Sequence, residues 1–450
     1  MAAGTLKPLS RRAWILVAVL AVCVVGRGGY ALYLVHSDQI VTTTGDAPSY
    51  LAPARMLAEH ARFENLHGNE EYLRTPGYPL FIAAVYRVFG ERNTAVLLVQ
   101  VLLSACTVYL AYLLASRMWS STVGLVAAVL TLVEPLQNAT SATLLTETLA
   151  AFLLLAVAAI GYHALTAGRL RPGVWALLGF AITVSTFVRP VTYYLPPFVL
   201  LLLLVWSRRR RFPLVDVGKA VAAFLVPIVA LCGAWQVRNH HEVGSWRFSG
   251  VEAKNMYVFR AAGVVAREDG ISLADAQDRL VEALGPVGTR RAGERYDQLY
   301  RAGVRIVREH PVAALQDAAH GLGSELFEVR VKVFDYLDFS PPEWLARAAL
   351  AVLLAFYALC LYGIFLVARA RRHLAAHALV LGIAAYNLLA SAGPEAWGGR
   401  GERFRAPVMP ILVLYAAFGA CTLYTSLRNR RARLTSESAS VAQLDRASHF

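Results

Sequence analysis

Long apolar runs alternate with short polar segments along most of the chain. A helix needs about 20 apolar residues to cross a bilayer, because its backbone polar groups cannot be left unpaired in hydrocarbon. By this criterion the pattern predicts an all-α, polytopic membrane protein with about ten transmembrane helices. The expected spans lie near residues 13–35, 93–116, 121–138, 144–166, 173–188, 190–206, 219–237, 343–368, 374–391 and 406–427.

Basic residues gather in the polar segments between these runs. Under the expected order of spans, all of the clusters fall on one side of the membrane, which the positive-inside rule makes cytoplasmic. We therefore expect a multi-pass protein of the inner (plasma) membrane with both termini in the cytoplasm. The clusters are Lys7, Arg11 and Arg12; Arg117; Arg169 and Arg171; Arg208 to Arg211; Arg369, Arg371 and Arg372; and Arg428, Arg430, Arg431 and Arg433.

Composition narrows the class of protein. The chain is 57% hydrophobic and 16% charged, with a mean hydropathy of +0.48, which excludes a soluble domain. A net charge of +14 could indicate a nucleic-acid partner, but the basic residues do not form one soluble face, so we expect none. The five cysteines all lie in apolar runs without the paired spacing of a zinc site.

The remaining polar segments fall on the other, outer side of the membrane. We expect an N-terminal transmembrane catalytic module over residues 1–237, which includes a large first outer loop at 36–92. A long outer region with amphipathic helices follows at 238–342, then C-terminal transmembrane helices at 343–434. Residues 435–450 are polar and Ser-rich, and their composition predicts a disordered tail.

Six short motifs lie on the outer side of the predicted membrane helices: Thr44–Tyr50, Arg74–Pro79, Leu145–Thr148, Phe187–Pro190, Trp235–Asn239 and Arg403–Pro410. Their order resembles that in the GT-C class of membrane glycosyltransferases. The resemblance is to the family 39 type, which includes protein O-mannosyltransferases and lipid A aminoarabinose transferases. It extends over almost the whole chain and implies a GT-C-like fold with large outer loops.

Two acids are the candidate catalytic residues. The resemblance implies that Asp46 is the base that accepts a proton from the acceptor, and that Glu147 corresponds to the second acid of the family. Many relatives have Asp in place of Glu147, so a divalent metal is left open and no other cofactor is expected. From the residues alone, Asp46 could instead cap the following helix, and Glu147 could form a structural ion pair with an arginine.

Outer arginines are the candidate phosphate ligands, because a guanidinium group matches phosphate oxygens and stays charged. The candidates are Arg74, Arg189, Arg238, Arg403 and Arg405, of which Arg74 and Arg238 are the strongest. The alternative for each is contact with lipid headgroups. Further candidate site residues are Tyr50, Tyr78, Asn239 and Lys254.

These features predict an enzyme that transfers a sugar from a polyprenyl-phosphate carrier to an envelope acceptor, on the non-cytoplasmic face of the bilayer. The acceptor could be a lipid, a polysaccharide or a protein. A transporter or flippase of lipid-linked saccharides is the alternative, but it should need polar groups along a path through the membrane. The predicted spans carry few charges below their outer ends, which favours the enzyme. A scaffold without activity is a third option.

Overall fold

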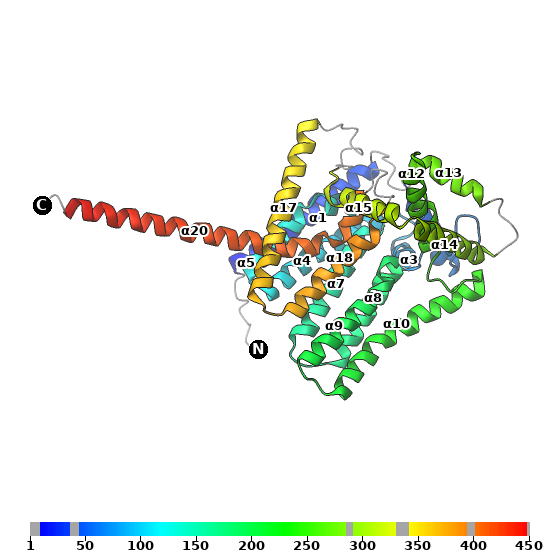
Figure 1. The fold of residues 1–450 in the computed structure, drawn as a ribbon, viewed down its shortest axis with the longest axis horizontal. Helices are drawn as coiled ribbons and strands as arrows, with labels where there is room; N and C mark the ends of the chain where they lie inside the picture. Colours follow the sequence, from blue (N-terminus) through cyan, green and yellow to red (C-terminus); the bar gives the residue numbers. More distant parts are fainter. Residues whose placement is uncertain (1–9, 37–44, 285–290, 330–341, 394–400, 448–450) are drawn as a thin grey trace, which may run out of the picture.

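The computed structural model describes residues 10–36, 45–284, 291–329, 342–393 and 401–447, with side chains described up to residue 433. These residues are almost entirely helical and contain no β-strand; a single isolated bridge joins Glu64 and Glu70. The predicted all-α class is therefore confirmed (Figure 1).

The helices follow the expected alternation of long apolar segments and shorter polar ones. In chain order they are α1 (Arg11–His36), α2 (Ala47–His60), α3 (Gly77–Phe89), α4 (Asn93–Met118), α5 (Ser121–Val133), α6 (Pro135–Ser141), α7 (Glu147–Thr166), α8 (Pro172–Val188), η1 (Pro190–Tyr194), α9 (Pro196–Arg209), α10 (Leu214–Val243), α11 (Gly250–Lys254), η2 (Asn255–Ala261), α12 (Ala262–Asp269), α13 (Leu273–Ala283), α14 (Ala292–Glu309), α15 (Pro311–Phe327), α17 (Glu343–Ala370), α18 (Leu374–Ser391), α19 (Gly401–Arg405), η4 (Ala406–Val408) and α20 (Met409–Ala447).

Eight segments of the described chain are long and apolar enough to cross a membrane: α1, α4, α7, η1 with α9, α10, α17, α18, and α19 to Arg433. The bent pair α5 and α6 could form a ninth span, with an angle of 56° between its two helices. The predicted span at 173–188 corresponds to α8, an apolar helix of 17 residues that is slightly shorter than the others. Each of the ten predicted spans therefore coincides with a helix, and eight or nine of these helices have spanning length.

The bend between α5 and α6 has a local cause and a distant support. Glu134 takes an extended conformation that ends α5, as the residue before a proline favours, and Pro135 begins α6, where its missing backbone N–H leaves no α6 hydrogen bond unmade. The buried guanidinium of Arg27, from the middle of α1, donates to the carbonyl oxygens of Thr131 (3.0 Å) and Leu132 (3.1 Å) and to Asn138 Oδ1 (2.7 Å). It therefore satisfies carbonyl groups that would otherwise be unpaired where α5 ends.

Two side-chain contacts place two of the basic clusters, those of Arg12 and Arg117, at the same end of the bundle. Arg12, at the start of α1, donates to Ser121 Oγ at the start of α5 (2.6 Å). Arg117, at the end of α4, lies 2.7 Å from His163 Nδ1 at the end of α7. The opposite end, where α7 begins, carries the longer polar connections.

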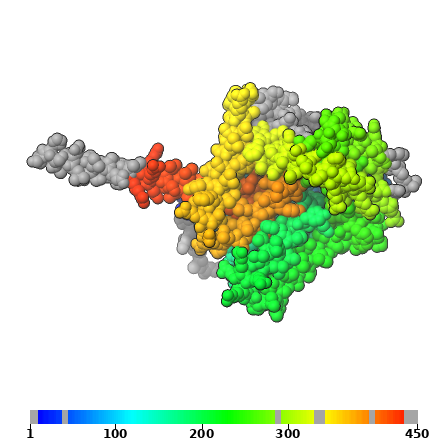
Figure 2. Space-filling model, in the orientation of Figure 1, coloured from blue at the N-terminus to red at the C-terminus, as the bar shows by residue number. Residues whose placement is uncertain are grey.

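The segments from α11 to α15 form a lobe at that opposite end, away from the two termini (Figures 1 and 2). Tyr257, Leu280 and Leu299 are buried at its core. One of the amphipathic helices expected in the outer region is α14, which buries one face against η2 and α11. At the other end of the molecule α20 projects from the bundle and continues as helix to Ala447, whereas the sequence predicts a disordered tail from residue 435.

Candidate active site

A cavity of about 610 Å³ lies between the lobe and the adjoining ends of the bundle helices. Its walls combine residues that are far apart in the sequence, because α2, the segment before α3, η1, α11, η2, α18 and α19 all reach it. The polar and aromatic lining includes Asp46, Tyr50, Arg74, Arg189, Tyr193, Tyr194, Glu252, Lys254, Arg260, Tyr300, Tyr386, Asn387, Ser391 and Arg403.

Asp46 lies on the cavity and is held by two arginines. Its Oδ1 accepts from Arg74 Nη2 at 2.5 Å, and its Oδ2 accepts from Arg403 Nη2 at 3.0 Å. Asp46 occupies the residue before α2, but its side chain does not cap that helix, so the capping alternative is wrong. Burial alone would raise the pKa of its carboxyl, but the two guanidinium groups lower that pKa to about 2.

Arg74 is fixed by contacts on several sides. Besides Asp46, it donates to Ser49 Oγ (2.9 Å) and Tyr50 OH (3.1 Å) and lies 4.6 Å from the centre of the Tyr50 ring. The loop that carries Arg74 is held close to α8, because a Cβ added at Gly77 would lie 2.5 Å from the backbone carbon of Phe187. A glycine at this position therefore permits the approach that brings Arg74 near the end of α8.

Glu147 lies behind the cavity lining, fully buried at the first residue of α7. Its Oε1 accepts a hydrogen bond from Arg403 Nε and lies 3.6 Å from Arg189 Nη1. The ion-pair alternative for Glu147 is thus observed, while its role in catalysis stays a prediction. Arg403 joins both predicted acids, since one guanidinium group contacts Asp46 and Glu147 together.

Six of the predicted site residues line the cavity: Asp46, Tyr50, Arg74, Arg189, Lys254 and Arg403. Tyr78 is buried beside it, donates to Gln100 Oε1 (2.6 Å) and lies edge-on to the Tyr50 ring at 5.2 Å. Asn239 is buried in α10 and donates to the carbonyl oxygens of Arg247 and Phe248 at 3.0 Å. Tyr78 and Asn239 therefore support the cavity walls without lining them.

The structure does not bring Arg238 and Arg405 to the cavity, which differs from the prediction that they hold the phosphate. Arg238 pairs with Glu70 and lies 5.0 Å from the ring centre of Trp235. Arg405 donates to the carbonyl oxygens at the end of α15, those of Glu325 (2.8 Å), Leu326 (3.0 Å) and Glu328 (3.0 Å). Arg405 thus supplies the cation that the carbonyl end of a helix favours, and its position is explained without a phosphate.

Several lining residues were not predicted from the sequence. They include Glu252, Arg260, Tyr193 and Tyr194, which come from η1 and the segments α11 and η2. Tyr193 and Tyr194 follow the Arg189–Pro190 motif directly, and this was the available signal. No sequence motif around Arg260 indicates a role in the site. The side chain reaches the cavity from the lobe and donates to the carbonyl oxygen of Ala390 at 2.8 Å.

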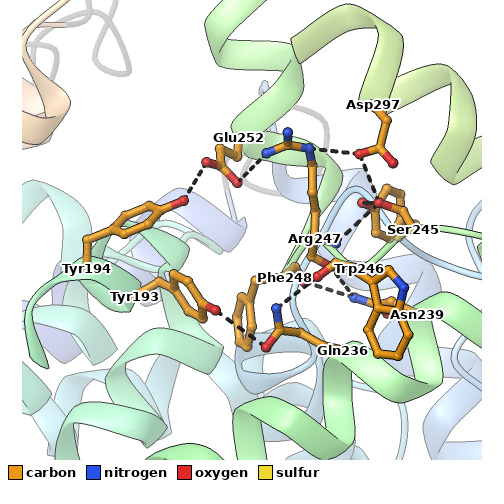
Figure 3. Close-up of polar contacts among 11 residues, drawn as sticks. Tyr193, Tyr194, Gln236, Asn239, Ser245, Trp246, Arg247, Phe248, Glu252 and Asp297 are labelled. Carbon is orange, nitrogen blue, oxygen red and sulfur yellow. Dashed lines mark hydrogen bonds and ion pairs between the residues drawn. The ribbon is translucent and has the colours of Figure 1, made fainter. Parts of the chain in front are cut away.

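One polar network crosses the wall of the cavity (Figure 3). Tyr194 donates to Glu252 Oε1 at 2.6 Å, and Arg247 lies 3.4 Å from the other oxygen of Glu252. Arg247 also contacts Asp297 Oδ1 at 2.8 Å, which in turn accepts from Ser245 Oγ at 3.0 Å. The network therefore joins η1, at the end of a span, to α14 in the lobe.

The charges of the lining favour an anion. Five cationic side chains line the cavity, namely Arg74, Arg189, Lys254, Arg260 and Arg403, against the two carboxylates Asp46 and Glu252. The described residues contain no group of three or more His, Cys, Asp or Glu side chains placed to hold a metal. Because guanidinium groups already bind Asp46 and Glu147, this donor set does not fit a divalent cation.

Part of the sequence matches a known family model, and the fold matches solved structures. Residues 73–235 match the family model described as dolichyl-phosphate-mannose-protein mannosyltransferase. No curated protein matches the sequence. Among solved structures, the apo oligosaccharyltransferase of Archaeoglobus fulgidus matches with a TM-score of 0.52 and 12% identity, over 94% of this chain and 52% of that chain.

The same oligosaccharyltransferase tethered with an acceptor peptide matches with a TM-score of 0.51 and 12% identity, over 94% of this chain and 51% of that one. ArnT from Cupriavidus metallidurans, bound to undecaprenyl phosphate, matches with a TM-score of 0.40 and 15% identity, over 91% of this chain and 78% of that chain. The chain thus spans about half the length of the oligosaccharyltransferase. The resemblance predicted from the sequence is confirmed: this is a multi-pass membrane protein with the fold of the GT-C class of glycosyltransferases.

Proposed function

We propose that the chain transfers a sugar from a polyprenyl-phosphate carrier to an envelope acceptor, and that the reaction takes place in the cavity on the non-cytoplasmic side of the membrane. The observation that carries the proposal is the pairing of one carboxylate, Asp46, with two arginines on the wall of a cationic cavity. Such a site offers a proton acceptor and fixed positive charge within one enclosed space.

In the proposed reaction, an oxygen or nitrogen atom of the acceptor attacks the anomeric carbon of the donor. The bond from that carbon to the phosphate oxygen breaks, and its electron pair stays on the phosphate. The proton of the acceptor passes to Asp46. The phosphate gains one negative charge, and Arg74 and Arg403 stabilise that charge because guanidinium groups bind phosphate oxygens through paired hydrogen bonds.

Binding of the donor phosphate should also change the pKa of Asp46. With a pKa of about 2, Asp46 is ionised at neutral pH but is a weak base while both arginines bind it. A donor phosphate would compete for the same two guanidinium groups. As they turn to the phosphate, the pKa of Asp46 rises, and the carboxylate becomes a better proton acceptor only when the donor is present.

Glu147 acts in this scheme through Arg403, and is a positioning residue. It lies at the first turn of α7, where a carboxylate is favoured by the helix dipole, and it holds the Nε side of Arg403. The Nη2 atom of Arg403 remains directed toward Asp46 and the cavity. Loss of Glu147 should therefore weaken the placement of Arg403.

The position of the site favours an enzyme over a flippase. A flippase needs polar groups along a route through the bilayer. The charged lining residues here lie at one end of the bundle. Arg27, the buried cation in the middle of α1, donates to Ser104, Asn138 and two backbone carbonyl groups and is used structurally.

The test uses purified protein in nanodiscs, supplied with a panel of polyprenyl-phosphate sugars and crude envelope acceptors. Wild type should consume at least one donor, and Asp46→Asn should abolish that consumption. Asp278→Asn, a substitution of an exposed aspartate on α13, is the matched control and should behave as wild type. If folded wild-type protein consumes no donor but moves labelled saccharide across liposomes, the proposal is wrong and the chain is a transporter.

A further inference from the structure

A second hollow lies on the lobe, along the C-terminal half of α14. It has a volume of about 500 Å³ and is lined by Arg247, Tyr300, Arg301, Val304, Arg305, Arg308 and Glu309. We call it the α14 arginine groove.

Three arginines of α14 give the groove its charge. Arg301, Arg305 and Arg308 are four and three residues apart, so they lie on one face of the helix over about 10 Å of its length. All three side chains are exposed, and within the described residues no ion pair or hydrogen bond engages their guanidinium groups. Arg301 and Arg305 are like charges at i, i+4 spacing, whose repulsion a bound anion would relieve; Glu309 is the one acid among the lining residues.

The groove adjoins the cavity through a shared residue. Tyr300 lines both, and the Arg247 guanidinium lies 3.5 Å from the centre of its ring. Glu252 and Asp297 hold Arg247 in the wall between the two hollows and neutralise its charge (Figure 3). A molecule in the groove would therefore lie next to the space where the acceptor must enter.

We propose that the α14 arginine groove binds the acceptor, and that the acceptor is a saccharide carrying phosphate or carboxylate groups. The inference rests on the proposed transferase function, because it assigns the acceptor class of that same site. The three arginines bind the anionic groups, while the acceptor's reactive hydroxyl passes Tyr300 to reach Asp46.

The lining of the groove favours a saccharide over two other anionic partners. Val304 is its one aliphatic side chain, so it offers little apolar surface for lipid acyl chains or for the apolar centre of a protein interface. Tyrosine rings at the junction suit sugars, because each supplies an apolar face and a hydroxyl that can donate and accept. Tyr300, Tyr193 and Tyr194 all line the adjoining cavity.

The experiment measures binding of oligogalacturonate, a carboxylated saccharide, to the full chain in nanodiscs of zwitterionic lipid. Maltooligosaccharide of the same length is the neutral probe. The test variant is Arg301→Gln/Arg305→Gln/Arg308→Gln. A charge-matched control, Arg62→Gln/Arg87→Gln/Arg92→Gln, removes three exposed arginines near α2, α3 and α4.

Wild type should bind oligogalacturonate more tightly than maltooligosaccharide. Binding should weaken about tenfold in the test variant, as expected for three exposed ionic contacts, and stay near wild type in the control. Equal binding of the two probes, full binding by the test variant, or the same loss in both triple variants would overturn the proposal. So would binding of anionic lipid vesicles without binding of oligogalacturonate.

Failure of the transferase function itself would look different. In that case wild type would bind oligogalacturonate through the groove but consume no polyprenyl-phosphate sugar. Asp46→Asn separates the two sites further, because it should remove donor consumption while oligogalacturonate binding is retained. The affinity for a polyprenyl monophosphate, measured on the same samples, reports whether the cavity of each variant is intact.

Discussion

Replacing Asp46 by asparagine should make the protein bind a polyprenyl phosphate more tightly while it loses transfer activity. In the structure the Asp46 carboxylate accepts hydrogen bonds from the Nη2 atoms of Arg74 and Arg403, the two side chains that we assign to the phosphate. A phosphate must displace this carboxylate before it can bind. Asparagine has nearly the same volume but no charge, so the competition is weakened.

The pKa of Asp46 gives the size of the effect. The two arginines and the other surroundings lower it from the ordinary value of 3.8 to about 2. Since one pKa unit corresponds to 1.36 kcal/mol, the fall from 3.8 to about 2 favours the ionised carboxylate by about 2.4 kcal/mol. If the phosphate must overcome all of this preference, Asp46→Asn should bind the phosphate up to about 60-fold more tightly, because about 1.4 kcal/mol is tenfold in affinity.

The assay is a titration of nanodisc-embedded protein with a short-chain polyprenyl monophosphate at fixed ionic strength. Asp278→Asn is again the control and should match wild type, because that aspartate is exposed on α13. Unchanged or weaker phosphate binding by folded Asp46→Asn would refute the reasoning, since the carboxylate and the phosphate would then not share the arginines.

Three further predictions concern stability and geometry. Burial raises the pKa of Glu325 from 4.5 to about 8, so its contribution to stability is complete below pH 4.5 and is lost as pH rises toward 8. Glu325→Gln should therefore reduce the fall in Tm between pH 5 and 9. An unchanged dependence of Tm on pH would contradict the raised pKa of Glu325. Gly77→Ala should lower the free energy of unfolding by about 1–3 kcal/mol, because the new Cβ meets the backbone of Phe187. It should also lower the affinity for phosphate, because Arg74 moves with its loop. Thermal unfolding tests the first effect and phosphate titration the second. Arg27→Met should destabilise the protein by about 1–3 kcal/mol for each carbonyl group of the α5–α6 bend that it leaves without a donor. Equal Tm values for variant and wild type would rule out this structural role.

Local sequence was sufficient to locate most of the helices of this protein. The apolar runs determine where membrane helices form, because hydrocarbon tolerates only backbone groups paired within a helix. The sequence predicted one span over 121–138, whereas the structure breaks it at Pro135, where Arg27 donates to the carbonyl groups at the end of α5. The motifs also identified Asp46, Arg74, Arg189 and Arg403, all of which line the cavity.

Tertiary structure alone decided which charges meet. Asp46 pairs with Arg74, 28 residues away, and with Arg403, 357 residues away, and no local pattern specifies either partner. Arg238 and Arg405 look equivalent to these arginines in the sequence, yet packing directs one to Glu70 and the other to the carbonyl end of α15. The physical reason is that a guanidinium group binds whichever carboxylate, carbonyl or phosphate oxygen the packed helices bring within reach.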